Sequence, residues 1–186
     1  MARQIDAGAP ADVVLLAAPV WMTWLRDRGA VQADAVVDLL GNSLVLIAPA
    51  DSNVAPDPAD LAGALGDARL AMGQRDAVPA GIYAREWLEA TGQWEAIAPH
   101  LAETDNVRSA LALVARAETP LGVVYRTDAL AEPQVRILYD IPQDTHSPIT
   151  YPAAALTDSG AAFMAHLQSD DARAVFARHG FKPLPE

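Results

Sequence analysis

Short apolar runs alternate along the chain with stretches whose apolar residues recur every three or four positions. The apolar runs predict β-strands, which we place at residues 12–17, 44–48, 69–72, 122–125, 135–139 and 153–156. The periodic stretches predict amphipathic helices, at residues 21–28, 58–65, 80–90, 107–116, 160–168 and 171–178. Strands that alternate with helices are typical of an α/β fold rather than of a helical bundle or a β-sandwich.

Composition narrows the class of protein. The chain has 186 residues, of which 52% are hydrophobic and 20% charged, enough to form the core of one domain or of two small lobes. Its formal net charge of -11 repels phosphate backbones and anionic membrane surfaces, so we expect no nucleic-acid partner. Cysteine is absent, which excludes disulfides, thiolate nucleophiles and thiolate metal sites.

The first part of the sequence shows neither a membrane span nor a signal peptide. The longest apolar stretch, Val13 to Met22, is interrupted by Pro19 and is half as long as the about 20 residues that a spanning helix needs. Residues 1–10 lack the basic region followed by an apolar one that marks a signal peptide. Residues 2–7 resemble the end of a helix with no capping residue before it. We therefore expect the complete helix to begin before Met1.

Sequence signatures of catalysis are missing. The four histidines, at positions 100, 146, 166 and 179, do not have the spacing of metal ligands. No nucleophile elbow, phosphate-binding loop or dinucleotide motif occurs. An acid/base group of Asp128, Asp140, Asp144 and His146 is the weaker alternative, because nothing in their spacing brings these residues together. We therefore expect a protein that is not an enzyme, with no catalytic residue and no resident metal.

The turn before residues 80–90 predicts an exposed helix start. Pro79 disfavours helix in the residue before it and suits a first helical turn. The amides of Ala80 and Gly81 would then lack intrahelical partners and point outward. By itself such a start is also compatible with a purely structural role, because every helix has one.

A second helix start follows residues 104–106. Either Asp105 or Asn106 can cap this helix, which leaves the amide of Val107 in the first turn. Two helix starts directed at one cleft bind an anion without lysine or arginine, because the helix dipoles and unpaired N–H groups supply the attraction.

Around these residues the sequence resembles the periplasmic molybdate-binding proteins, the substrate-binding components of molybdate ABC transporters. The matching strings are ARQIDAGAPADV (2–13), LLGNSLVLIAP (39–49), RLAMG (69–73), VPAGIYARE (78–86), DNVRSALALV (105–114), PLGVVYRTDA (120–129), IPQDTHSPITYP (141–152) and FARHGF (176–181). The resemblance covers the sequence from end to end.

This resemblance implies a fold, a ligand and a set of binding groups. The fold is two α/β lobes of the type II periplasmic-binding-protein class, and the function is capture of molybdate or tungstate for an ABC transporter permease in the periplasm, without a cofactor. The family's ligand groups fall on the backbone amides of Ala80 and Val107 and on the phenol of Tyr125. Without the resemblance, Tyr125 would be interpreted as a core aromatic residue with a polar tip.

The resemblance also implies that one lobe is incomplete. The family begins with a strand, a helix and a second strand that carry two ligand serines, and no such segment stands before residue 2 here. We therefore expect an intact second lobe at 38–152 and a first lobe, 1–37 plus 153–186, that lacks this opening unit. Because the two ligand serines are missing, we expect weak oxyanion binding. From the exposed strand edge at residues 13–16 we expect self-association into a homo-oligomer. The alternative function is a cytoplasmic anion-sensing regulatory domain of the same fold.

Overall fold

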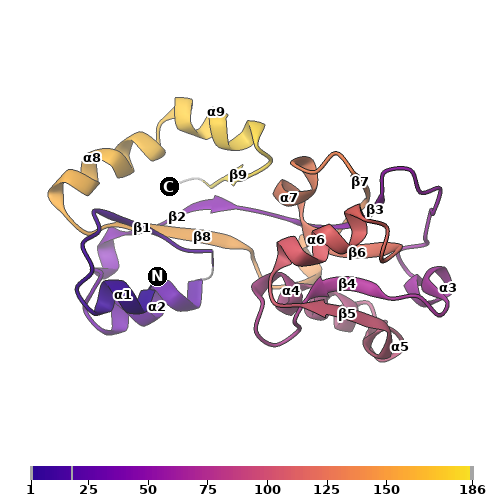
Figure 1. Ribbon diagram of the computed structural model, residues 1–186. Coiled ribbons are helices and arrows are strands. Elements are labelled where there is room, and N and C mark those ends of the chain that lie inside the picture. The colour runs from indigo at the N-terminus through magenta and orange to yellow at the C-terminus, as the bar shows by residue number, and fades with distance from the viewer. Residues whose placement is uncertain (1, 18, 185–186) are drawn as a thin grey trace. The chain divides into compact units, whose positions relative to one another are not determined.

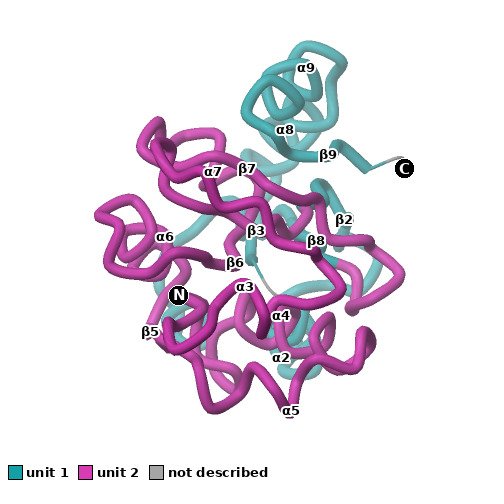
Figure 2. Tube along the Cα trace, turned by 90° about the vertical axis from the view of Figure 1, so that its right-hand side faces the viewer, with its two compact units in different colours: residues 1–42, 149–186 teal, residues 43–148 magenta. Residues whose placement is uncertain are grey.

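The chain forms two compact units in the computed structural model, which describes residues 2–17 and 19–184. Unit 1 consists of residues 1–42 and 149–186, and unit 2 consists of residues 43–148 (Figures 1 and 2). We expected the helix of residues 2–7 to begin before Met1. Met1 itself lies outside the described residues.

Unit 1 contains a four-stranded antiparallel sheet with the order β1-β8-β2-β9. Its strands are β1 (Val13–Leu15), β2 (Val36–Gly41), β8 (Thr150–Ala155) and β9 (Lys182–Pro183). Its helices are α1 (Ala2–Asp6), α2 (Pro19–Asp27), α8 (Asp158–Leu167), α9 (Asp170–Arg178) and the short 3-10 helix Ala33–Ala35. Helices α1 and α2 lie on one side of the sheet, and α8 and α9 on the other (Figure 1).

Strand β1 stands at an edge of this sheet. The Leu16 amide donates to the carbonyl of Pro152 at 3.0 Å, so Val14 and Leu16 face β8 in the antiparallel ladder. Val13 and Leu15 therefore turn their backbone groups away from β8, and within residues 2–17 and 19–184 no second strand lies on that side of β1.

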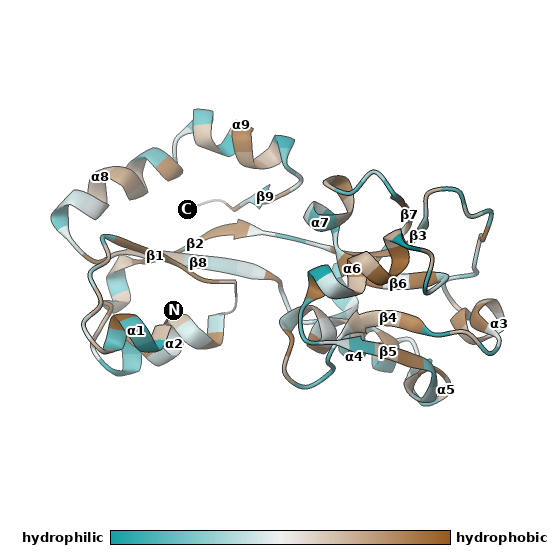
Figure 3. Cartoon of the chain, in the orientation of Figure 1, coloured by the Kyte–Doolittle hydropathy of each residue, from teal (hydrophilic) through white to brown (hydrophobic). Residues whose placement is uncertain are grey.

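Unit 2 contains a five-stranded mixed sheet with the order β5-β4-β6-β3-β7. Its strands are β3 (Leu44–Pro49), β4 (Leu70–Gly73), β5 (Leu101–Thr104), β6 (Leu121–Tyr125) and β7 (Val135–Asp140). Strand β4 is parallel to both β5 and β6, whereas β3 is antiparallel to β6 and β7. Strands β4 and β6 are predominantly hydrophobic along their length (Figure 3).

Helices cover this sheet and complete the core of unit 2. They are α3 (Leu61–Leu65), α4 (Pro79–Ala90), α5 (Trp94–Ile97), α6 (Val107–Ala115), α7 (Arg126–Leu130) and the 3-10 helices Ala98–His100 and Gln143–Thr145. Ala110, Leu111 and Val114 of α6 pack against Val45 and Val124 of the sheet. These residues form the buried face of the amphipathic helix predicted over residues 107–116.

The prediction of an α/β fold is confirmed, although several elements were missed. All six predicted strands and all six predicted helices have counterparts, whereas β2, β5, β9, α5 and α7 were not predicted. The expected lobe boundaries, 37/38 and 152/153, differ from the observed ones, 42/43 and 148/149. The difference arises because β2 and β8 stay paired as far as Gly41 and Thr150, which keeps both strands in unit 1.

Among the helices of the described chain, none combines the length and the apolar character needed to cross a membrane.

Candidate functional site

The start of α4 holds the first predicted donor, the amide of Ala80. Val78 precedes the helix in an extended conformation, with φ of -97° and ψ of 122°, and Pro79 is the first helical residue. The carbonyl of Val78 accepts from the amides of Gly81 at 2.8 Å and Ile82 at 3.0 Å. The expectation that the Gly81 amide is free is therefore wrong, because the turn itself uses it. No backbone carbonyl within residues 2–17 and 19–184 accepts from Ala80.

The start of α6 holds the second predicted donor, the amide of Val107. Asn106 is the capping residue, and its side-chain oxygen accepts from the amide of Ser109 at 2.9 Å. Asp105 supports the cap instead of forming it, because its carboxylate accepts from the side-chain amide of Asn106 at 2.8 Å. Val107 follows as the first helical residue, and no carbonyl of the described chain accepts from its amide.

Tyr125, the third predicted group, is the last residue of β6. It is buried, with 8% of its surface exposed, and it lies opposite Leu44 in the antiparallel pair with β3. The chain then turns into α7, where the amide of Arg126 donates to the carbonyl of Ser43 at 2.8 Å.

The topology of unit 2 places all three groups at one edge of its sheet. Gly73 at the end of β4 is in register with Thr104 at the end of β5, and Ala71 is in register with Gly122 of β6. The parallel strands β4, β5 and β6 therefore end at the same edge. Helices α4 and α6 begin at this edge, and Tyr125 lies there at the end of β6. In the sheet, β5 lies on one side of β4 and β6 lies on the other, so the direction of strand addition reverses at β4. Ligands of open α/β sheets bind at such a topological switch point.

An ion pair joins the loop that leads into α4 to the end of β5, the strand that precedes α6. The Nε of Arg75 donates to Oε1 of Glu103 at 2.9 Å, and its Nη2 donates to Oε2 at 2.8 Å. The backbone amide of Arg75 donates to the same carboxylate at 2.8 Å. Hydrogen bonds from Arg75 hold the pKa of Glu103 below its usual range, and Glu103 in turn raises the pKa of Arg75. This pair was not predicted from the sequence, because 28 residues separate its members.

Two carboxylates of the weaker acid/base alternative, Asp128 and Asp140, have separate partners. Asp128 lies 3.7 Å from the guanidinium of Arg108, and Asp140 pairs with Arg126. Burial raises the pKa of Asp128, and Arg108 lowers it by a smaller amount.

His146 is held by other neighbours. Its ring Nδ1 is 2.7 Å from the carbonyl oxygen of Ser147, and its ring centroid is 5.9 Å from that of Tyr83. Its Nε2 is buried without a hydrogen-bond partner among the described residues. Across that part of the chain, no group of three or more histidine or acidic side chains could hold a metal ion.

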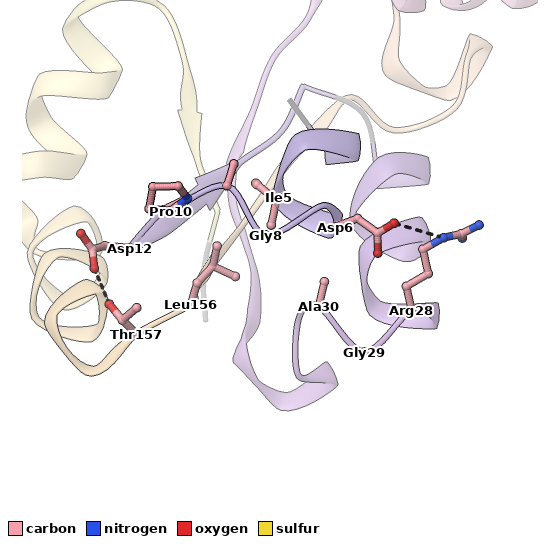
Figure 4. Close-up of a pocket in the computed structure, with 12 residues that line it drawn as sticks. Ile5, Asp6, Gly8, Pro10, Asp12, Arg28, Gly29, Ala30, Leu156 and Thr157 are labelled. Atoms are coloured by element: carbon pink, nitrogen blue, oxygen red, sulfur yellow. Dashed lines mark hydrogen bonds and ion pairs between the residues drawn. The ribbon is translucent and has the colours of Figure 1, made fainter.

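A cavity in unit 1 contains none of the predicted ligand groups. It measures about 560 Å³ and is bordered by the 6–12 loop, the 28–30 turn and residues 156–157 (Figure 4). Asp6 is 3.7 Å from Arg28 on one side, and Asp12 accepts from the hydroxyl of Thr157 at 2.6 Å on the other. The Thr157 and Ser159 hydroxyls lower the pKa of Asp12. The polar groups around this cavity thus mainly bind one another.

The sequence matches a known family and known proteins over most of its length. The family model described as bacterial extracellular solute-binding protein matches residues 1–182. The chain is 41% identical to the molybdate-binding protein of Escherichia coli over 190 aligned residues, which cover 97% of this chain and 74% of that protein. It is 40% identical to the molybdate-binding protein of Haemophilus influenzae, with the same coverage. These relatives are binding proteins rather than enzymes.

Solved structures show the same fold. A substrate-binding domain from Clostridium difficile superposes with a TM-score of 0.85 at 30% identity, covering 99% of this chain and 82% of the other. The periplasmic molybdate-binding protein of Azotobacter vinelandii gives a TM-score of 0.81 at 19% identity, covering 100% and 83%. The expected periplasmic-binding-protein fold is thereby confirmed.

Proposed function

Because the chain belongs to the family of bacterial extracellular solute-binding proteins, we propose that it binds the molybdate or tungstate oxyanion and presents it to the permease of an ABC transporter. The names of its relatives in Escherichia coli and Haemophilus influenzae support molybdate as the ligand. The proposed place of action is the periplasm, and no cofactor takes part.

One observation carries this proposal: two helix starts and a tyrosine stand at the same edge of the unit 2 sheet. In the proposal, the amides of Ala80 and Val107 and the phenol of Tyr125 donate to the oxyanion. Each helix start also contributes the equivalent of about half a positive charge. Neutral donors of this kind attract a small dianion at short range even though the chain as a whole has a net charge of -11.

A polypeptide limited to residues 1–186 is proposed to bind the oxyanion weakly. It contributes three of the donors, whereas the family resemblance places further donors on two serines upstream of the matched residues. Each neutral hydrogen bond contributes about 0.5 to 1.5 kcal/mol, so the loss of the hydroxyl and amide donors of both serines would weaken binding by orders of magnitude. A calorimetric dissociation constant at or below the micromolar range for this polypeptide would refute weak binding.

The site assignment is tested by titrating isotope-labelled protein with molybdate and following the amide signals by NMR. We expect the signals of Ala80 and Val107 to shift most. Tyr125→Phe removes one donor and should weaken binding about threefold to tenfold. Tyr139→Phe, which alters a tyrosine of β7, is the matched control and should leave the affinity unchanged. Shifts confined to other amides would refute the assignment.

The alternative function, a cytoplasmic anion-sensing domain, would bind the same ligand and differs in its biological context. Adjacent permease and ATPase genes would support transport, and loss of molybdate uptake on deletion would decide for it. A regulator gene beside this one, with uptake intact after deletion, would support sensing.

We also propose that the polypeptide of residues 1–186 self-associates through the edge of β1. The backbone groups of Val13 and Leu15 face away from β8, and Leu15 and Trp21 expose 38% and 41% of their surface. A second copy that adds its own β1 in antiparallel orientation would pair these groups, because a two-fold axis relates the edge to itself.

A further inference from the structure

Each member of the ion pair between Arg75 and Glu103 lies a few residues before one of the proposed donor amides. Arg75 is five residues before Ala80, and Glu103 is four residues before Val107. The pair therefore joins the loop in front of one donor amide to the strand end in front of the other. We propose that Arg75 and Glu103 are positioning residues that fix the separation of the two amides and thereby adjust the site to the size of its oxyanion. This inference rests on the proposed function.

The first loop is stiff enough to pass a displacement of Arg75 to the start of α4. The amide of Val78 donates to the carbonyl of Gln74 at 3.0 Å, and the amide of Asp76 donates to the side chain of Gln74 at 2.8 Å. Asp76 also accepts from Arg85 of α4 at 2.9 Å. Residues 74–78 therefore form a closed turn that is tied both to itself and to the helix that it begins.

The second loop is equally constrained. The amide of Gln74 donates to the carbonyl of Thr104 at 2.8 Å, which continues the β4–β5 pairing by one residue. The Thr104 hydroxyl lies 2.8 Å from the carbonyl of Asn106 and 3.3 Å from that of Met72. Glu103 is thus connected to the cap of α6 through a short, hydrogen-bonded segment.

The ring of Trp94 lies close to the arginine of the pair. The guanidinium carbon of Arg75 is 5.0 Å from the centroid of the Trp94 ring, and that of Arg85 is 5.1 Å from it. Both members of the pair are partly buried, with 26% of each side chain exposed. A planar guanidinium with two parallel hydrogen bonds has a defined orientation, which a lysine at this position would not have.

A positioning role and a purely electrostatic role predict opposite effects on oxyanion affinity when the Glu103 side chain is removed. If the two charges acted on the oxyanion only through their fields, removal of Arg75 would weaken binding and removal of Glu103 would strengthen it. If the pair positions the amides, removal of either residue weakens binding, and removal of both costs little more than removal of one.

The experiment is an NMR titration of the 186-residue chain and its variants with molybdate and, separately, with the smaller sulfate. We expect Arg75→Ala and Glu103→Ala each to weaken molybdate binding at least about threefold and to lower the ratio of molybdate to sulfate affinity. Arg75→Lys should behave like Arg75→Ala. The controls are Arg116→Ala and Glu118→Ala, which disrupt a surface pair of 2.6 Å elsewhere in unit 2 and should leave both affinities unchanged.

The outcomes separate this inference from the proposed function. Absence of any response of the Ala80 and Val107 amides in the unmodified chain would overturn both. A normal response in the unmodified chain together with tighter binding by Glu103→Ala, or with an unchanged selectivity ratio in both alanine variants, would overturn the positioning role alone. A general loss of stability would lower both affinities together and leave their ratio constant, which also counts against positioning.

Discussion

A side chain at Gly81 would collide with the backbone of Gly73. A Cβ atom built on Gly81 overlaps the carbonyl oxygen of Gly73 and lies 2.6 Å from that of Gln74. The first turn of α4 therefore rests directly on the end of β4, and the absence of a side chain at position 81 allows the Ala80 amide to reach the edge of the sheet.

Gly81→Ala should consequently move the start of α4 or destabilise it. We expect unfolding in urea to show a loss of about 1 to 3 kcal/mol, because the colliding atoms belong to the backbone and cannot rotate away. Gly41→Ala is the control, since a Cβ there meets its nearest neighbours at 3.4 to 3.6 Å, ordinary contact distances. Equal stability of the two variants would contradict the close approach.

Asn106→Ala should remove the cap of α6. The expected loss is about 1 kcal/mol in the free energy of unfolding, together with faster hydrogen exchange in the first turn of the helix. Asp105→Ala removes only the support of the cap and should cost half as much or less. If Asp105→Ala proved the more damaging change, Asp105 and not Asn106 would be the functional cap.

The Arg75–Glu103 pair should persist into the acidic range. Because the pKa of Glu103 is lowered in the folded protein, the unfolded chain binds the proton at a higher pH than the folded one. Stability from this pair is therefore complete above the unfolded pKa and is lost as the pH falls through the folded pKa.

An NMR titration of the Glu103 side-chain carboxyl carbon measures this directly. Arg75→Ala should raise the pKa of Glu103 toward its usual value, whereas Arg116→Ala should leave it unchanged. A Glu103 pKa that stays the same without Arg75 would show that the pair contributes nothing to ionisation.

Leu15→Lys should reduce self-association. A lysine on an edge strand opposes pairing with another strand, so sedimentation velocity at micromolar concentrations should show a shift toward monomer. Leu130→Lys is the control, because Leu130 is 55% exposed but lies in unit 2. An unmodified chain that sediments as a single monomeric species would rule out the proposed association.

Local chemistry was sufficient to predict the helix starts. Pro79 and the polar residues before Val107 placed both within one residue of their observed positions. The choice between Asp105 and Asn106 needed coordinates, because both side chains can cap a helix. The prediction of a free Gly81 amide was wrong. This amide donates to the carbonyl of Val78, and that hydrogen bond depends on the geometry of the turn.

Elements that depend on distant partners could not be predicted in the same way. Strand β5, with the sequence LAET, is short and half polar, and it becomes a strand by pairing with β4. Strand β2 contains Asp38, where the register with β8 shifts, so its apolar pattern is interrupted. The Arg75–Glu103 pair is equally non-local, because only the parallel pairing of β4 and β5 brings these side chains into contact.

The position of β8 between β1 and β2 has a consequence for synthesis on the ribosome. Every strand of the unit 2 sheet has been made once residue 148 is reached, whereas within residues 2–17 and 19–184 the strand that lies between β1 and β2 is made only when residues 150–155 follow. Chains are made from the N-terminus, and unpaired apolar strands are prone to aggregate. All strands of the sheet with the proposed binding edge have therefore been made while β1 and β2 still lack their common partner, β8.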